Sequence, residues 1–169
     1  MRVLQTERLV LRWLNPGDAA FILELVNDPS WLTYIGDKGV RTLRDAEDYI
    51  RNGPVDMYRR FGFGLYLVES RNDAEPLGMC GLIKRESLED VDLGFAFLPR
   101  FRGKGYAYEA AVATMAYGKS VFGLPRIVAI VSRDNLPSRN LLDRLGFRFE
   151  RTAALKPNDE EIELYATPT

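Results

Sequence analysis

The feature that most constrains the fold is a loop with two nearby glycines between a strand-like segment and the strongest predicted helix. Residues 91–98 predict a strand that ends at Pro99, residues 100–105 form the loop, and residues 105–122 carry a helical stripe that includes three alanines. The β-branched run at 126–131 predicts a buried strand, and residues 137–145 predict a short helix. This strand–helix–strand–helix passage predicts a mixed α/β domain.

The first half of the chain predicts more helix. After a strand over 9–14, Asn15-Pro16 predicts a helix start and Asp28-Pro29 its end. Residues 30–41 are loop-like. Thr42 opens a capping-box pattern for a second helix, which we expect to end near Arg51 because Gly53-Pro54 interrupts it, with a short helical piece to Arg60. The remaining strand-like segments are 62–70, 77–84, 147–153 and 160–166, the first two joined by a polar turn.

Length and composition exclude several classes of protein. The 169 residues correspond to a single domain over 1–169, and 23 basic against 24 acidic residues leave a net charge of −1, which disfavours duplex DNA binding. The chain has no histidine and one cysteine, Cys80, so imidazole catalysis, His-ligated metals and an intrachain disulfide are excluded. No signal peptide or membrane span is evident. We therefore expect a cytoplasmic protein with no membrane partner and no bound metal.

The glycine loop has the composition of an anion site. The segment Arg100–Ala107 carries three cations (Arg100, Arg102 and Lys104) and no acid, and it opens a helix. The first turn of a helix has unpaired N–H groups, and Gly103 and Gly105 allow the backbone to turn sharply toward a ligand. The glycines alone would also fit a plain tight turn with solvated cations. The spacing differs from those of the Walker loop and the dinucleotide fingerprint.

The ordered motifs resemble the GCN5-related N-acetyltransferase (GNAT) superfamily. Arg100-x-x-Gly103-x-Gly105 has its Arg/Gln-x-x-Gly-x-Gly/Ala form, and Asn135–Phe147 is similar to the Asn-x-x-Ala/Ser…Leu-Gly-Phe segment that follows the next strand. Thr6–Arg12 and Asn27–Pro29 resemble the branch that contains ribosomal-protein alanine N-acetyltransferases. The resemblance runs from about residue 5 to residue 165. It implies one domain with a mostly antiparallel central sheet, splayed middle strands and flanking helices.

The resemblance also implies a ligand, acetyl-coenzyme A, as cosubstrate. Its pyrophosphate would contact the backbone N–H groups of the loop, and its pantetheine arm would lie between the splayed strands 91–98 and 126–131. Asn135 would hydrogen-bond the pantetheine, and it also fits an N-cap of the helix that follows. The implied cofactor-binding residues are Phe97, Leu98, Arg100, Arg102, Gly103, Lys104, Gly105, Tyr106, Asn135 and Ser138.

The implied chemistry is direct attack of a neutral primary amine on the thioester in a ternary complex. No covalent enzyme intermediate is needed, so Cys80 is interpreted as a packed strand residue. Deprotonating an α-amine at pH 7 costs only about 1 kcal/mol, against about 4.6 kcal/mol for a lysine. An α-amine acceptor therefore needs little help from a general base.

Asp92 and Ser138 are the candidate catalytic residues. Asp92 would act as the base, directly or through water, where family members often carry Glu; it would equally fit an ordinary hairpin-edge carboxylate. Many family members protonate the departing thiolate with a Tyr, but the matching position here is Leu142. Ser138 is the candidate hydrogen-bond donor to sulfur, and it would equally fit a helix cap.

The sequence says less about the residues that would surround the amine acceptor. Trp31, Tyr34 and the loop to Val40 lie where family members wall the amine site, and residues 154–160 are a second candidate wall; a core cluster is the alternative for the aromatics. A non-catalytic CoA-binding or regulatory module is the alternative function, motivated by Leu142. Nucleic-acid binding through the loop cations is a third, which the net charge disfavours. Whether the chain forms a homodimer stays open.

Overall fold

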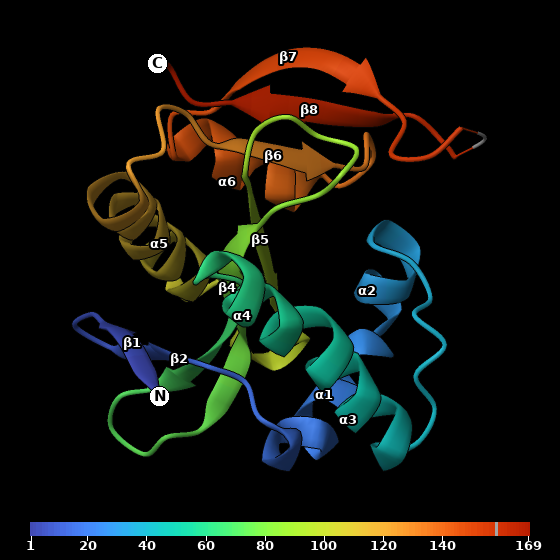
Figure 1. Ribbon diagram of the computed structural model, residues 1–169, viewed down its shortest axis with the longest axis vertical. Helices are drawn as coiled ribbons and strands as arrows, with labels where there is room; N and C mark the ends of the chain where they lie inside the picture. Colours follow the sequence, from blue (N-terminus) through green and yellow to red (C-terminus); the bar gives the residue numbers. More distant parts are fainter. Residues whose placement is uncertain (158) are drawn as a thin grey trace.

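The computed structural model describes residues 1–157 and 159–169. One sheet runs through the molecule, with helices on both faces (Figure 1). Its spatial order is β1-β2-β3-β4-β5-β6-β8-β7. The strands are β1 (Arg2–Gln5), β2 (Leu9–Arg12), β3 (Leu65–Ser70), β4 (Pro76–Ile83), β5 (Asp92–Phe97), β6 (Val128–Val131), β7 (Arg148–Ala153) and β8 (Ile162–Ala166).

The helices lie in two groups. The first group precedes β3 and the second follows β5. The α-helices are α1 (Ala19–Val26), α2 (Pro29–Tyr34), α3 (Leu43–Ile50), α4 (Asp56–Phe61), α5 (Tyr106–Phe122) and α6 (Leu136–Arg144). Two short 3-10 turns, η1 (Pro16–Asp18) and η3 (Pro99–Phe101), and a π-helical turn, η2 (Arg51–Val55), complete the set. In the described part of the chain, no helix has both the length and the apolar character needed to cross a bilayer.

Neighbouring strands are antiparallel at every pairing but one. β5 and β6 are parallel, and among the described residues the only pair between them is Asp92 and Val128. Beyond that pair the two strands part, so the sheet has a seam between β1–β5 and β6–β8. This arrangement confirms the predicted mixed α/β domain with a mostly antiparallel sheet and splayed middle strands.

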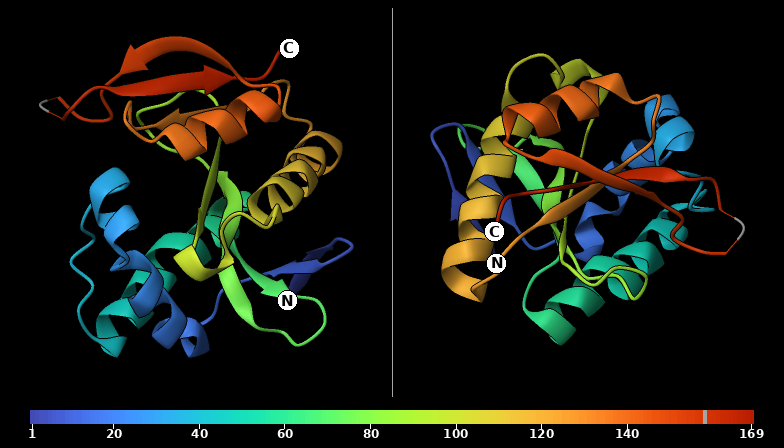
Figure 2. Two further views of the ribbon diagram at one scale, coloured as in Figure 1. Left: turned by 180° about the vertical axis from the view of Figure 1, so that it is seen from behind. Right: turned by 90° about the horizontal axis from the view of Figure 1, so that it is seen from above.

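The side-chain alternation of β3 and β4 places a core on each face of this part of the sheet. Tyr66, Cys80 and Leu82 face α5, where Ala110 and Ala111 are fully buried and allow the helix to approach the sheet closely. Leu67 and Met79 point to the other face and pack with α1, α2 and α3. The view from above in Figure 2 shows the sheet between these two helix groups, with α6 on the α5 side.

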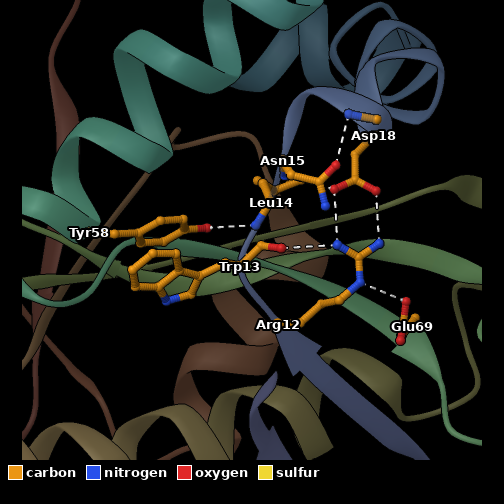
Figure 3. Close-up of polar contacts among 8 residues, drawn as sticks. Arg12, Trp13, Leu14, Asn15, Asp18, Tyr58 and Glu69 are labelled. Atoms are coloured by element: carbon orange, nitrogen blue, oxygen red, sulfur yellow. Dashed lines mark hydrogen bonds and ion pairs between the residues drawn. The ribbon is translucent and has the colours of Figure 1, made fainter. Parts of the chain in front are cut away.

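A charged cluster anchors the end of β2 to its surroundings. The Arg12 guanidinium donates to both Asp18 carboxylate oxygens, at 2.8 and 3.0 Å, and to Glu69 on β3 at 3.0 Å (Figure 3). Asp18 in turn accepts from the Asn15 N–H in the capping box of η1. These bonds fix where the chain leaves the sheet for the first helix group.

One sequence-based expectation was wrong, and two other segments add detail that the sequence did not supply. Asp28-Pro29 begins a helix rather than only ending one, because the Asp28 side chain accepts from the Ser30 N–H and Pro29 occupies the first turn of α2. The next α-helix, α3, ends at Ile50 and the short helix α4 follows to Phe61, both as expected; between them the backbone does not break at Gly53-Pro54 but widens into the π-helical turn η2. The N-terminal residues, to which the sequence assigned no element, form β1, which pairs antiparallel with β2.

Candidate active site

The open edge of β5 is the first part of the site. The Leu98 N–H donates to the Leu77 carbonyl on the β4 side, and paired antiparallel residues alternate in the direction of their hydrogen bonds. The backbone groups of Phe95 and Phe97 therefore point away from β4, toward the seam. β6 no longer pairs with β5 at this height, so this edge is available to a ligand that can hydrogen-bond like a strand.

The end of that edge is partly occupied by the protein itself. The Phe97 carbonyl accepts from Arg102 Nε and Nη2 at 3.1 and 2.9 Å. Both backbone groups of Leu98 are engaged, since its carbonyl accepts from the Phe101 N–H. The Arg102 guanidinium also contacts Ser30 and lies 3.3 Å from Asp28, so it ties α2 to β5.

The glycine loop presents free backbone donors. Gly103 and Gly105 have φ of +75° and +82°, which confirms the predicted sharp turn before α5. The N–H groups of Gly103, Lys104, Gly105 and Tyr106 donate to no other residue among those the structure describes. Together with the helix N-terminus, they form a concentrated patch of positive potential.

The loop cations are less free than the sequence suggests. Arg100 pairs with Glu24 at 2.7 Å and Arg102 with Asp28, both acids from the first helix group. Lys104 has no acidic partner in the described ranges. The local sequence contains no acid, but the tertiary fold brings two to the loop.

A residue that the sequence did not assign to the site, Arg8, supports this loop. Its Nη1 donates to the Lys104 carbonyl at 2.9 Å, and its guanidinium lies 4.6 Å from the centre of the Tyr106 ring. Glu109 on α5 holds Arg8 at 2.7 Å and accepts from the Thr6 hydroxyl. The Thr6–Arg8 segment thus holds the glycine loop in place. In the sequence, only the resemblance of Thr6–Arg12 to the family pointed to this segment.

Two cavities meet at the seam. One, of about 750 Å³, is lined by the glycine loop, α2 and the start of α6; the other, of about 350 Å³, is lined by the first helix group, β5 and β6. They share lining residues from α2, β5 and α6: Trp31, Tyr34, Ile35, Phe95, Ala96, Asn135 and Ser138. We name them the loop cavity and the inner cavity. The two cavities therefore adjoin at these residues, on either side of the start of α6.

The start of α6 lies where the two cavities meet. The Asn135 side chain accepts from the Ser138 N–H at 3.3 Å, so its predicted capping role is present. The Asn135 amide N–H₂ and the Ser138 hydroxyl have no partner among the residues described. Leu142, at the position where the resemblance expects Tyr, is buried against the inner cavity.

Asp92 lies at the base of the seam and lines the inner cavity. It is 1% exposed, and one carboxylate oxygen accepts from Arg85 Nε at 2.7 Å. The other oxygen, Oδ1, is buried and without a partner in the described part of the molecule. Burial raises the pKa of Asp92 above its usual range, although Arg85 and Lys84 act in the opposite direction.

The predicted acceptor walls line the inner cavity. Trp31 is both a core residue and a cavity residue, so the two interpretations of this aromatic hold together. The Tyr34 carbonyl accepts from the Ser132 hydroxyl at 2.9 Å, which links α2 to the end of β6. Of the predicted wall 154–160, Leu155 lines the cavity, and position 158 lies outside the described residues.

Two further features, Cys80 and the acidic side chains, bear on a cysteine nucleophile and on a metal site. Cys80 is buried beside Thr114, and burial raises the pKa of its thiol to about 12, so it is a packed strand residue as predicted. Among the described residues, no three His, Cys, Asp or Glu side chains gather in a way that could hold a metal ion.

Comparison with known proteins gives a consistent result. The family model for the acetyltransferase (GNAT) domain matches residues 8–148. The uncharacterized N-acetyltransferase YnaD of Bacillus subtilis is 29% identical over 147 residues, which cover 87% of this chain and 83% of YnaD. Spermidine N(1)-acetyltransferase of Escherichia coli K12 is 27% identical over 142 residues, 83% of this chain and 73% of that enzyme.

Solved structures agree in fold. An acetyltransferase from Agrobacterium tumefaciens superposes with a TM-score of 0.83 at 26% identity, covering 98% of this chain and 94% of the other. RimL, a ribosomal L7/L12 alpha-N-protein acetyltransferase crystallised in complex with coenzyme A, superposes with a TM-score of 0.82 at 19% identity, covering 98% and 97%.

Proposed function

This chain belongs to the acetyltransferase (GNAT) domain family, whose members use acetyl-CoA, and we propose that it transfers the acetyl group to a primary amine by direct attack in a ternary complex. In this reaction the amine nitrogen bonds to the thioester carbonyl carbon, and the C–S bond breaks. The nitrogen loses one proton, and the departing sulfur gains one, to give an N-acetyl amine and the free thiol of coenzyme A. No enzyme nucleophile is required.

The parting of β5 from β6 beside the free N–H groups of the glycine loop is the observation that carries this proposal. Backbone donors at a helix N-terminus suit the pyrophosphate of acetyl-CoA. The backbone groups of Phe95 and the N–H of Phe97, which point away from β4, suit the amides of the pantetheine arm, as does the Asn135 amide. We assign this edge to Phe95 and Phe97 rather than to Leu98, whose backbone groups are engaged.

Asp92 and Ser138 are the groups we assign to proton handling. Asp92 lines the inner cavity, has one oxygen without a partner among the described residues, and has a raised pKa, so it is a better base than an exposed aspartate. It accepts the amine proton directly or through a water molecule. The Ser138 hydroxyl lies where the two cavities meet, has no partner in the described part of the chain, and donates a hydrogen bond to the sulfur. Leu142 supplies no acid.

Calorimetric titration with acetyl-CoA and a thiol-release assay over a panel of amines together test the proposal. We expect binding in the micromolar range and thiol release with at least one amine. No binding at millimolar acetyl-CoA would overturn the proposal. Binding without thiol release from any amine would favour the alternative, a non-catalytic CoA-binding module.

The role of Ser138 is tested by Ser138→Ala in the same assay. We expect kcat to fall about tenfold, because one hydrogen bond to a developing thiolate is lost. Ser120→Ala, in the exposed C-terminal part of α5, is the matched control and should keep the wild-type kcat. Equal kcat values for the two variants would remove Ser138 from the mechanism.

A further inference from the structure

The inner cavity carries a net positive charge. Its charged lining residues among those described are Lys38, Arg85 and Asp92, two cations and one acid. Its other walls are mainly apolar, from α2, β4 and the C-terminal hairpin. A cavity for a polyamine would need acids in excess of cations, since like charges repel. The charge balance here is the opposite.

The Arg85 guanidinium is held in place through Nε, and its terminal nitrogens have no acceptor among the described residues. Its Nε is held by Asp92 at 2.7 Å, which limits the orientations of the planar group. Its two Nη atoms have no acceptor within the described residues, and the side chain is 33% exposed. A guanidinium with free terminal nitrogens suits a carboxylate, which can accept two parallel hydrogen bonds.

Lys38 adds a second cation to the lining of the same cavity. It has no acidic partner in the part of the chain that the structure describes, and the residue as a whole is exposed. Desolvation of the ammonium, followed by the positive charges of Arg85 and Lys156, lowers the pKa of Lys38. Lys38 and Arg85 thus line one cavity, and an anionic group between them would offset the repulsion of their positive charges.

Asp92 supplies the complementary feature. Its Oδ1 is a buried acceptor without a protein partner, which costs stability unless a donor arrives. An ammonium or amine is such a donor. The cavity therefore offers an acceptor for an amine beside donors for an anion.

We propose that the acceptor is a small amine that also carries a carboxylate, as an amino acid does, with the amine at Asp92 and the carboxylate at Arg85 and Lys38. This inference rests on the proposed function. The cavity of about 350 Å³ is at the small end of ligand sites, and residues such as Ile35, Met57 and Ile162 would contact an apolar body. An apolar amino acid has the amine, the carboxylate and the apolar body that these three parts of the cavity would contact.

Matched acceptors test the carboxylate. Leucine and leucinamide, and phenylalanine and phenylalaninamide, differ in the carboxylate, and spermidine serves as the polycation. We expect kcat/KM for each acid to exceed that of spermidine by at least tenfold, because spermidine would place positive charge against Lys38 and Arg85.

Because acids and amides differ in amine basicity, the decisive quantity is how a variant changes the acid-to-amide ratio of kcat/KM. Lys38→Gln should lower this ratio about fivefold, mainly by raising KM for the acid. Lys119→Gln, an equal charge change in α5 away from the cavity, should leave the ratio unchanged. Arg85→Lys should lower the ratio as well while keeping a cation beside Asp92.

The outcomes separate this inference from the proposed function. If spermidine is the best acceptor, or if Lys38→Gln and Arg85→Lys leave the ratio at its wild-type value, the carboxylate assignment is overturned and acetyl transfer stands. If acetyl-CoA binds but no free amino acid is acetylated, the assignment is likewise overturned. If acetyl-CoA itself does not bind, the proposed function fails first.

Discussion

At the scale of single residues, the carboxylate of Asp92 is the titratable group at the base of the seam whose pKa the fold changes. The folded protein buries it, and this burial raises its pKa even with Arg85 at 2.7 Å. The folded state therefore binds this proton more tightly than the unfolded state. The contribution of Asp92 to the free energy of unfolding falls as pH rises from its ordinary pKa to its raised one.

The same shift predicts a pH dependence of catalysis. A base must be deprotonated, so kcat/KM should fall on the acidic side of the raised pKa, at a pH above the ordinary range of an aspartate. Asp92→Asn should remove this limb and lower kcat about 100-fold. Asp90→Asn, which breaks the pair with Arg126 instead, is the control in a pH series. An unchanged profile for Asp92→Asn would exclude it as the base.

The loop cations predict a difference between two neutralising substitutions. Lys104 has no acidic partner in the described ranges, whereas Arg100 pairs with Glu24. Lys104→Gln should weaken acetyl-CoA binding about fivefold, and Arg100→Gln should weaken it less, because Glu24 already offsets that charge. Calorimetric titration at low and high salt measures both. A larger effect from Arg100→Gln would contradict the interpretation.

At the scale of elements, α5 depends on glycine at both ends. Gly103 and Gly105 precede it and Gly123 follows it, all with positive φ. A Cβ at Gly103 or at Gly123 would meet no atom within 4 Å. The cost of an alanine at either position is therefore backbone strain, about 1–2 kcal/mol.

This symmetry gives a matched pair of substitutions. Gly103→Ala and Gly123→Ala should lower the free energy of unfolding by similar amounts, seen as a Tm lower by a few degrees. Only Gly103→Ala should weaken acetyl-CoA binding, about tenfold, because it displaces backbone N–H donors. Thermal melts and calorimetry separate the two effects. Equal affinity in both variants would show that the loop does not bind the pyrophosphate.

At the scale of the whole molecule, the seam divides the sheet. Strands β1–β5 and β6–β8 are joined through the Asp92–Val128 pair, and the Ser132–Tyr34 hydrogen bond links β6 to α2 across the site. A ligand in the seam would contact both halves. Its binding energy would therefore stabilise the whole fold rather than one part.

Acetyl-CoA should accordingly raise the Tm. At 100 times Kd, binding to the folded state adds about 2.7 kcal/mol, or roughly 5–10 °C for a chain of this length. Hydrogen exchange should slow in β5, in the glycine loop and in the start of α6 together. Protection confined to one side of the seam would contradict a ligand that lies between the strands.

The sequence by itself determined the local elements and the family. Asn15 and Thr42 cap the turns that their side chains predicted, and the glycine loop turns where Gly103 and Gly105 stand. The Cys80 environment also followed from an apolar strand pattern. These predictions are correct because each feature depends on residues within a few positions of one another, where backbone preferences and short-range hydrogen bonds act.

Only the tertiary structure decided the partners of charged groups. Glu24 and Asp28 reach the loop arginines, Arg8 braces the loop from the N-terminus, and Arg85 meets Asp92 from the preceding turn. It also decided that the helix passes Pro54 and that the inner cavity is cationic. Such pairings depend on side chains brought together by long-range packing, and local periodicity carries no information about them.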